Sequence, residues 1–190
     1  MLPLALELAN KNVLVIGAGR VGTGKAALLV EAGANVTIVT RDVRAELPRG
    51  LTSLHQRDYR DGDLAGFALV VSATGDASVN DLVVHEARRT NVWLNVVDDP
   101  ARSDFFFTAV HRAGDVTVSV STEGASPALA QVVRSMIAEG LPENLAAVAE
   151  QLRLERAAFH ADGASTEGID WRGRILELLA NPELSNHSAR

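Results

Sequence analysis

The sequence predicts an α/β fold: a parallel sheet, then a β-α segment of different character, then a helical C-terminal region. Three observations lead to this prediction. Short β-branched runs alternate with stretches of helical periodicity over roughly the first hundred residues, which is typical of a doubly wound parallel sheet. After Pro100 the apolar residues of one run alternate strictly with polar ones, as in a half-buried antiparallel strand. The last part of the chain has the spacing of helices.

The elements of the first half follow one another in a regular order. Continuous apolar runs are typical of strands that are buried on both faces. They predict strands at 12–17, 35–40, 51–56, 68–74 and 92–97, of which 51–56 is the weakest. Apolar residues at helical spacing predict a helix over 21–32, ended by Gly33, and another over 76–90 with Asp76 as its N-cap.

The second half begins with the alternating run, in which valine and hydroxyl residues predict a strand within 115–122. A helix is expected over 126–140, because Ser126 suits the N-cap and Pro127 the first helical position. A further helix is expected to have Pro142 near its first turn, and a small-residue linker over 161–168 leads to a last helix over 170–180.

Composition limits the class of protein. The chain has 190 residues, of which 47% are hydrophobic and 22% charged, as in an ordinary globular protein. The formal net charge of −6 argues against a binder of nucleic acid or of anionic membranes. The absence of cysteine excludes disulfides, thiolate metal sites and cysteine nucleophiles. Residues 1–11 lack a basic region and are too short to cross a membrane, so a cytoplasmic protein is expected.

A glycine motif joins the first predicted strand to the first predicted helix. Residues 17–22, GAGRVG, match GxGxxG in the strand-turn-helix context that gives the pattern meaning. Gly17 allows the tight turn, Gly19 lets the backbone approach a pyrophosphate, and Gly22 lets the helix pack on the sheet. The helix N-terminus offers N–H donors to the phosphates. The motif predicts a Rossmann-type dinucleotide site; the alternative is a turn with a structural role only.

The residue that reads the adenosine ribose is expected about 20 positions beyond the last glycine of the motif. Asp42 stands at that distance from Gly22. A carboxylate there accepts hydrogen bonds from the ribose 2′-OH and favours NAD, whereas the adjacent Arg41 suits the 2′-phosphate of NADP. Asp42 has an alternative role as the N-cap of a short helix over 43–47.

Two adjacent carboxylates, Asp98 and Asp99, follow the fifth predicted strand. Ligands of open α/β sheets bind beyond the carboxyl ends of the strands, so Asp98 is placed to meet a substrate. Its alternative role is that of a solvated acid. Asp99 precedes Pro100, which favours an extended backbone and a turn. A positioned carboxylate can take the proton that leaves during a dehydrogenation.

Other candidate groups carry weaker signals. The five histidines show no paired metal-ligand spacing, so no protein metal site is expected: His55, His85, His111, His160 and His187. The only tyrosine, Tyr59, has Asp63 four residues on, which excludes a short-chain reductase with a Tyr-x-x-x-Lys pair. Lys25 and Arg134 could pair with substrate carboxylates, but a surface role is expected for each. Three hydroxyl residues of the alternating run either contact substrate or face water: Ser119, Ser121 and Thr122.

Several stretches together resemble one family: KNVLVIGAGRVGTGKAALLVEAGANVTIV, VVSATGDASVN, LNVVDDPARSDFFF and VSVSTEGASPALAQVVR. In this order they resemble the precorrin-2 dehydrogenase and sirohydrochlorin ferrochelatase family, the N-terminal module of siroheme synthases. The resemblance runs from about Leu2 to Leu152. The chain departs from the family's pattern at Ala18, Gly24, Thr108 and Glu123, the last of which usually is glycine.

The resemblance implies NAD-dependent oxidation of precorrin-2 to sirohydrochlorin and, in some members, insertion of Fe²⁺ at the same site. It implies Asp98 as the essential aspartate. The implied nucleotide contacts are Gly17, Gly19, Arg20, Val21, Gly22, Arg41, Asp42 and Thr74. Because Glu123 adds a carboxylate where a carboxylate-rich substrate would lie, dehydrogenation is expected to be retained better than metal insertion.

The resemblance also implies a homodimer built by the central segment. The expected division of the chain is an NAD-binding Rossmann domain over 1–113, a dimerisation segment over 114–141 and a helical C-terminal region over 142–190. The rival hypothesis from another class is a non-catalytic NAD-binding regulatory module. Such a module shares the glycine motif but has no need of Asp98 or of the stretch STEGASP.

Overall fold

The computed structural model describes residues 1–161, 163, 165, 168–181 and 183–184. The chain forms two compact units, Met1–Phe107 and Thr108–Arg190. The expected linker over 161–168 lies partly outside the described residues. Within the part that the structure describes, no helix combines the length and the apolar character needed to cross a membrane.

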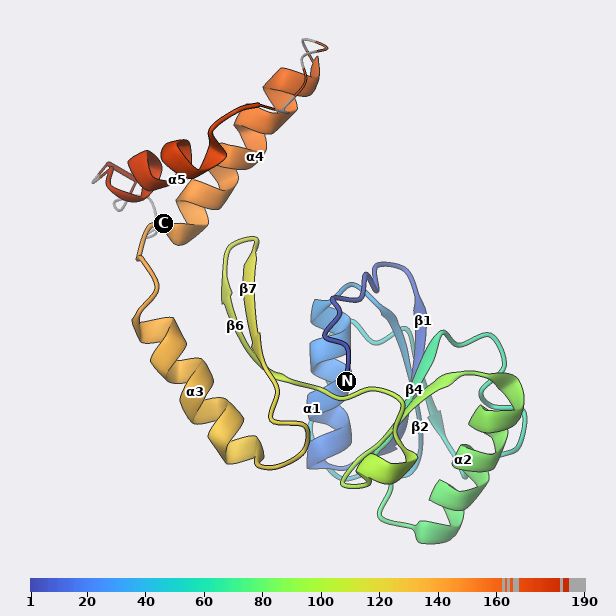
Figure 1. Cartoon of the computed structure of the whole chain (residues 1–190). Coiled ribbons are helices and arrows are strands. Elements are labelled where there is room, and N and C mark those ends of the chain that lie inside the picture. The colour runs from blue at the N-terminus through green and yellow to red at the C-terminus, as the bar shows by residue number, and fades with distance from the viewer. Residues whose placement is uncertain (162, 164, 166–167, 182, 185–190) are drawn as a thin grey trace. The chain divides into compact units, whose positions relative to one another are not determined.

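The first unit is a five-stranded parallel sheet with a helix on each face (Figure 1). The strands lie side by side in the order β3-β2-β1-β4-β5, and each neighbouring pair is parallel. Their bounds are β1 Asn12–Ala18, β2 Asn35–Val43, β3 Ser53–Gln56, β4 Leu69–Ser72 and β5 Trp93–Val96, with helices α1 Arg20–Glu31 and α2 Ala77–Thr90. The predicted α/β class is therefore confirmed.

Two apolar clusters fix the helices to the sheet. Val13 and Val15 of β1 pack with Ala26 and Leu29 of α1 on one face. On the other face, residues of β1, β4 and β5 pack with α2: Leu14, Ile16, Val70, Leu94, Val96, Val83 and Ala87. Because β1 is buried on both sides, its sequence is a continuous apolar run rather than an alternating one.

The strand order places a crevice at the carboxyl edge of the sheet. The chain leaves β1 toward β2 and β3 and then returns to add β4 and β5 on the other side. The loops after β1 and β4 therefore diverge, and this is the point at which open α/β sheets bind ligands.

The second unit begins with an antiparallel hairpin, β6 Ala109–Ala113 and β7 Val116–Val120, on which α3 Pro127–Glu139 packs. The alternating strand and the Ser126 cap of α3 are confirmed. Helices α4 Leu145–Ala161 and α5 Trp171–Leu179 follow. Helix α4 starts at Leu145, three residues after Pro142, so the proline lies near the first turn, as expected, and just before it. The buried Asn144 donates from Nδ2 to the carbonyl oxygen of Leu178, at the end of α5 (3.3 Å).

Candidate functional site

A cavity of about 620 Å³ opens at the carboxyl edge of the sheet in the first unit. It lies over the ends of β1, β2 and β4, which is where the strand order predicts a ligand site. Its walls come from four segments of the chain: 16–19, 39–44 without 43, 57–59 and 73–79 without 78.

The glycine motif forms one wall of the cavity, and two of its glycines are required by packing. Gly17 has a φ of +100°, and a Cβ on it would lie 2.7 Å from the carbonyl oxygen of Ala73. A Cβ on Gly22 would lie 2.1 Å from the carbonyl oxygen of Gly17. Gly19 differs, since no atom lies within 4 Å of its added Cβ. It is the N-cap of α1 and provides no side-chain cap, so the first-turn N–H groups stay available to an anion.

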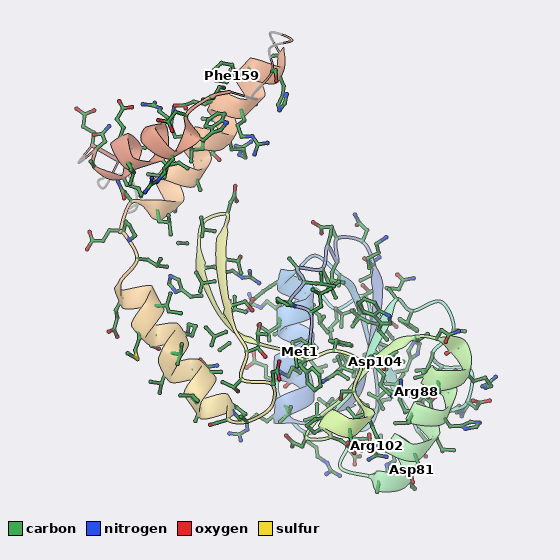
Figure 2. All side chains as sticks on the ribbon, viewed as in Figure 1. Met1, Asp81, Arg88, Arg102, Asp104 and Phe159 are labelled. Atoms are coloured by element: carbon green, nitrogen blue, oxygen red, sulfur yellow. The ribbon has the colours of Figure 1, made fainter. Side chains whose placement is uncertain are left out.

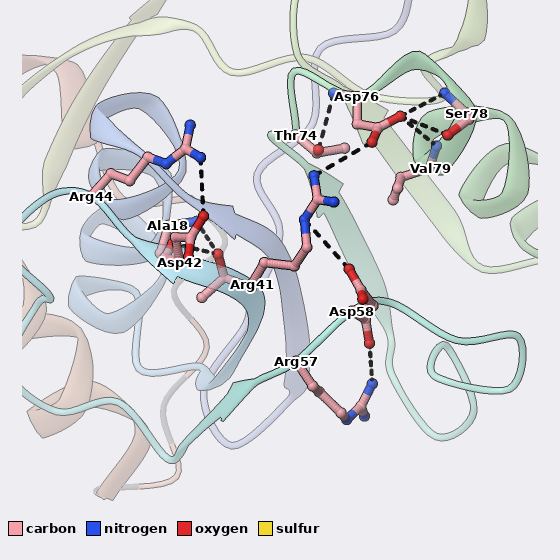
Figure 3. Close-up of polar contacts among 11 residues, drawn as sticks. Ala18, Arg41, Asp42, Arg44, Arg57, Asp58, Thr74, Asp76, Ser78 and Val79 are labelled. Atoms are coloured by element: carbon pink, nitrogen blue, oxygen red, sulfur yellow. Dashed lines mark hydrogen bonds and ion pairs between the residues drawn. The ribbon is translucent and has the colours of Figure 1, made fainter.

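The segment that is predicted to read the ribose continues strand β2 rather than starting a helix. Residues 41–43 belong to β2, so the alternative role of Asp42 as a helix N-cap is wrong. The Thr40 hydroxyl holds this segment on the glycine motif: Oγ1 accepts from the backbone N of Ala18 (3.2 Å) and donates to the carbonyl oxygen of Asp42 (2.7 Å). The Asp42 carboxylate pairs with Arg44 at 3.0 Å (Figure 3).

The turn after β4 forms the opposite wall and is held by a buried amide. Asn80 of α2 accepts from the Ser72 hydroxyl (2.7 Å) and donates to the carbonyl oxygen of Thr74 (3.3 Å). The Thr74 hydroxyl accepts from the backbone N of Asp76 (3.1 Å). Asp76 then caps α2, as expected. The hydrogen bond from the Ser78 hydroxyl and those from the backbone N–H groups of Val79 and Ser78 lower the pKa of Asp76, so this carboxyl is ionised at neutral pH.

Asp98 follows β5 with a backbone that few aspartates adopt. Its φ is +62°, in the left-handed region that costs a non-glycine residue free energy. Its side chain makes no hydrogen bond or ion pair with any residue that the structure describes. Asp98 is exposed and does not line the 620 Å³ cavity, although it lies at the same edge of the sheet.

Asp99 has a structural role. It is the N-cap of the short 3₁₀ helix Pro100–Arg102 and accepts from the backbone N of Arg102 (3.2 Å). Its other carboxylate oxygen lies 2.5 Å from Nε of Arg102. The interpretation of Asp99 as a turn residue is confirmed.

The segment that carries these two acids is fixed to α2 and β5. Arg102 pairs with Asp81 at 2.7 Å, and Arg88 pairs with Asp104 at 2.6 Å (Figure 2). The second Asp104 oxygen accepts from the backbone N of Leu94 (3.0 Å). The conformation around Asp98 is therefore held from both sides of the turn.

Lys25 of α1 is partly buried and lies close to Phe107 and to the charge of Asp98. Its ammonium stands 4.0 Å from the centroid of the Phe107 ring. Desolvation lowers the pKa of Lys25, and the nearby charge of Asp98 acts in the opposite direction. Sequence reasoning favoured a surface role for Lys25, because a single lysine on a helix carries no signal of its burial.

The structure brings some of the predicted site residues together. Five line the cavity: Gly17, Gly19, Arg41, Asp42 and Thr74. Arg20, Val21 and Gly22 form the first turn of α1 beside it. Asn80 and Asp58 are contributors that sequence reasoning missed. Among the described residues, no three His, Cys, Asp or Glu side chains are grouped as metal ligands would be. His187 lies outside the described residues.

Comparison with known proteins gives similarities in sequence and in fold. The chain is 39% identical to the siroheme synthase of Methylococcus capsulatus over 190 residues, which is 98% of this chain and 37% of the relative. It is 38% identical to the siroheme synthase of Tolumonas auensis over 78% of this chain and 32% of the relative. The chain thus spans about a third of the length of these relatives.

A solved structure shares the fold. SirC, a precorrin-2 dehydrogenase, superposes with a TM-score of 0.70 and 22% sequence identity, over 97% of this chain and 92% of the other. The family model described as putative NAD(P)-binding matches residues 4–109, more than half of the chain. With its glycine motif at the switch point of a parallel sheet, the chain belongs to this NAD(P)-binding family.

Proposed function

We propose that this chain oxidises precorrin-2 to sirohydrochlorin with NAD as hydride acceptor. The proposal depends mainly on one observation: Asp98 has a left-handed backbone and lies at the same edge of the sheet as the predicted dinucleotide cavity. Strain of this kind is retained where the surrounding structure holds it, and it clusters at active sites. The similarity to siroheme synthases and the fold of SirC support the choice of substrate.

The proposed division of labour follows from the positions of the residues. Bound NAD supplies the hydride acceptor. Gly17, Gly19 and the first turn of α1, Arg20 to Gly22, hold the pyrophosphate by backbone N–H groups. Asp42 accepts from the ribose 2′-OH, and Thr74 closes the opposite wall. Asp98 takes the proton that leaves the tetrapyrrole, which its open carboxylate is free to accept. An iron ion, where inserted, is a substrate of this site.

The test is an anaerobic assay of precorrin-2 with NAD, followed by its absorption spectrum. We expect formation of sirohydrochlorin and of an equal amount of NADH. NAD binding without any oxidation of precorrin-2 would instead favour a non-catalytic regulatory module, and the proposal would be given up.

We also propose a homodimer in which the segment 114–141 forms the contact. Helix α3 exposes a stripe of large apolar side chains at helical spacing: Leu129, Val132, Met136 and Ile137. Such a stripe is usually covered, and a symmetric copy is the commonest partner. Val132→Glu should yield a monomer by light scattering. Leu82→Glu, at an equally exposed apolar residue of α2, is the matched control and should leave the dimer intact.

A further inference from the structure

The three arginines that line the dinucleotide cavity are all paired with carboxylates. Arg44 pairs with Asp42 at 3.0 Å. Arg57 donates two hydrogen bonds to the Asp63 carboxylate, one from Nη1 (2.7 Å) and one from Nη2 (2.8 Å). Arg41 lies between two acids, 3.4 Å from Asp58 and 3.5 Å from Asp76, as Figure 3 shows. Each of these three guanidinium groups would therefore have to give up a carboxylate partner in order to bind an anionic ligand.

Arg41 connects two walls of the cavity. Asp58 follows β3, whereas Asp76 starts α2 on the far side of β1. Asp76 cannot turn away readily, because one of its oxygens accepts from the Ser78 hydroxyl (2.6 Å) and from the backbone N of Ser78 (3.0 Å). Its other oxygen is the one that faces Arg41. The guanidinium is thus neutralised from both sides.

This arrangement bears on the choice between the two dinucleotides. NADP carries an additional phosphate on the ribose 2′-oxygen, which requires a cation such as an arginine nearby. At the cavity of this chain that phosphate would meet Asp42, Asp58 and Asp76, and Arg41 would have to leave two carboxylates to bind it. NAD has only a hydroxyl at this position, and a carboxylate can accept a hydrogen bond from that hydroxyl.

We propose that Asp58 and Asp76 are specificity-determining residues of the cofactor site: by holding Arg41 they exclude the 2′-phosphate, so the chain selects NAD over NADP. The proposal rests on the dinucleotide site named under the proposed function, but not on precorrin-2 being the substrate. Asp58 and Asp76 act through Arg41, whereas Asp42 acts by direct contact with the ribose.

The test compares the dissociation constants of NAD and NADP for the full chain by titration calorimetry. Asp58→Asn releases one side of Arg41 without touching a helix cap. We expect the ratio Kd(NADP)/Kd(NAD) to fall by about three- to tenfold, because Arg41 then gives up only one exposed ion pair to bind the 2′-phosphate, and a small part of the fall comes from the lost like charge. The fall should be smaller at high salt, because these charges are exposed.

Two further variants distinguish an effect that acts through Arg41 from the general effect of removing a negative charge. Asp61→Asn removes an acid that is also 71% exposed and paired with an arginine, Arg89, outside the cavity, so the ratio should stay at the wild-type value. Arg41→Gln combined with Asp58→Asn should remove most of the gain in NADP binding and leave only the small part that comes from the lost like charge.

A ratio that is unchanged in Asp58→Asn, or a gain that persists in full without Arg41, would overturn the inference. Failure of the wild-type chain to bind either dinucleotide would overturn it together with the cofactor assignment. A chain that binds NAD selectively but does not oxidise precorrin-2 would leave the inference in place and refute the proposed function alone.

Discussion

The ammonium of Lys25 lies 4.0 Å from the centroid of the Phe107 ring, on a helix that starts at the glycine motif. Phe107 and Val97 pack on the same apolar cluster as Ala26, the neighbour of Lys25 in the chain. The lysine is thus drawn out of water toward an aromatic face, and a cation over a ring gains about 0.5–2 kcal/mol. Burial opposes this gain by disfavouring the charged form.

We predict that Lys25 makes stability rise with pH in the alkaline range. Burial lowers the pKa of Lys25 in the folded chain. Between that lowered value and about 10.4 the unfolded chain binds more protons than the folded one, so the free energy of unfolding increases with pH. Relative to Lys25→Met, the wild type should gain stability from pH 7 to pH 10 in urea unfolding. Lys11→Met controls for the loss of a lysine, and a constant difference for Lys25→Met would contradict the prediction.

A second prediction separates two glycines of α1. Gly22→Ala should destabilise the fold by about 1–3 kcal/mol, since its Cβ would overlap the carbonyl oxygen of Gly17 and force the loop to move. NAD binding should weaken with it. Gly24→Ala meets open space on the same helix and should stabilise the fold by about 0.5–1 kcal/mol. Thermal unfolding checks both; equal effects would show that the contact at Gly22 is not tight.

The strands of the sheet could be predicted from the sequence because they are buried on both faces. Val13, Leu14 and Val15 are all 0% exposed, so no polar residue interrupts the run. Strand β6 could not be predicted, since it buries only Ala109 and includes His111 and Arg112. Its strand conformation comes from pairing with β7, which is a contact that local periodicity does not encode.

Some residues of the candidate cofactor site could likewise be predicted from the sequence, and others could not. Gly17 and Gly22 could be placed on the cavity wall because the turn between strand and helix fixes their spacing, and Asp42 could be placed there because it lies at the end of the second strand. Asn80 could not, because its bonds to Ser72 and Thr74 exist only once α2 lies back on β4. The pairing of Arg41 with Asp58 likewise arises from the neighbouring position of β2 and β3.

A third prediction concerns the buried carboxylate beside the cavity. Glu86 is 1% exposed and accepts from the Tyr59 hydroxyl and from the backbone N of Leu64. Tyr59→Phe leaves this carboxylate short of a donor and should cost about 1–3 kcal/mol. Burial, with the bond to Glu86, raises the pKa of Tyr59, so its contribution is present below about pH 10 and is lost as pH rises further. Unfolding of both proteins at pH 8 and pH 11 measures this; a variant as stable as wild type at pH 8 would be the contrary result.

A fourth prediction concerns Glu123, which has a φ of +52°, a backbone conformation that favours glycine. Glu123→Gly should leave stability unchanged or raise it by at most about 1 kcal/mol, because the relief of a left-handed backbone is offset by chain entropy. Both Glu123→Gly and Glu123→Gln should raise Fe²⁺ insertion relative to dehydrogenation several-fold, if the charge is what hinders a carboxylate-rich substrate. An effect of glycine alone would assign the hindrance to the backbone instead.

The final prediction separates the two acids that follow β5. Asp98→Asn keeps the size of the side chain, and asparagine tolerates the left-handed backbone at least as well, so folding and NAD binding should be retained. It removes the proton acceptor, and the rate of precorrin-2 oxidation should fall by ~10² to 10⁴. Asp99→Asn gives up the ion pair with Arg102 and should lower stability only slightly, with little change in rate. NAD titration, urea unfolding and sirohydrochlorin formation measured on both variants decide the matter. Equal losses of rate would remove the distinction, and a fully active Asp98→Asn chain would reduce Asp98 to a strained turn residue.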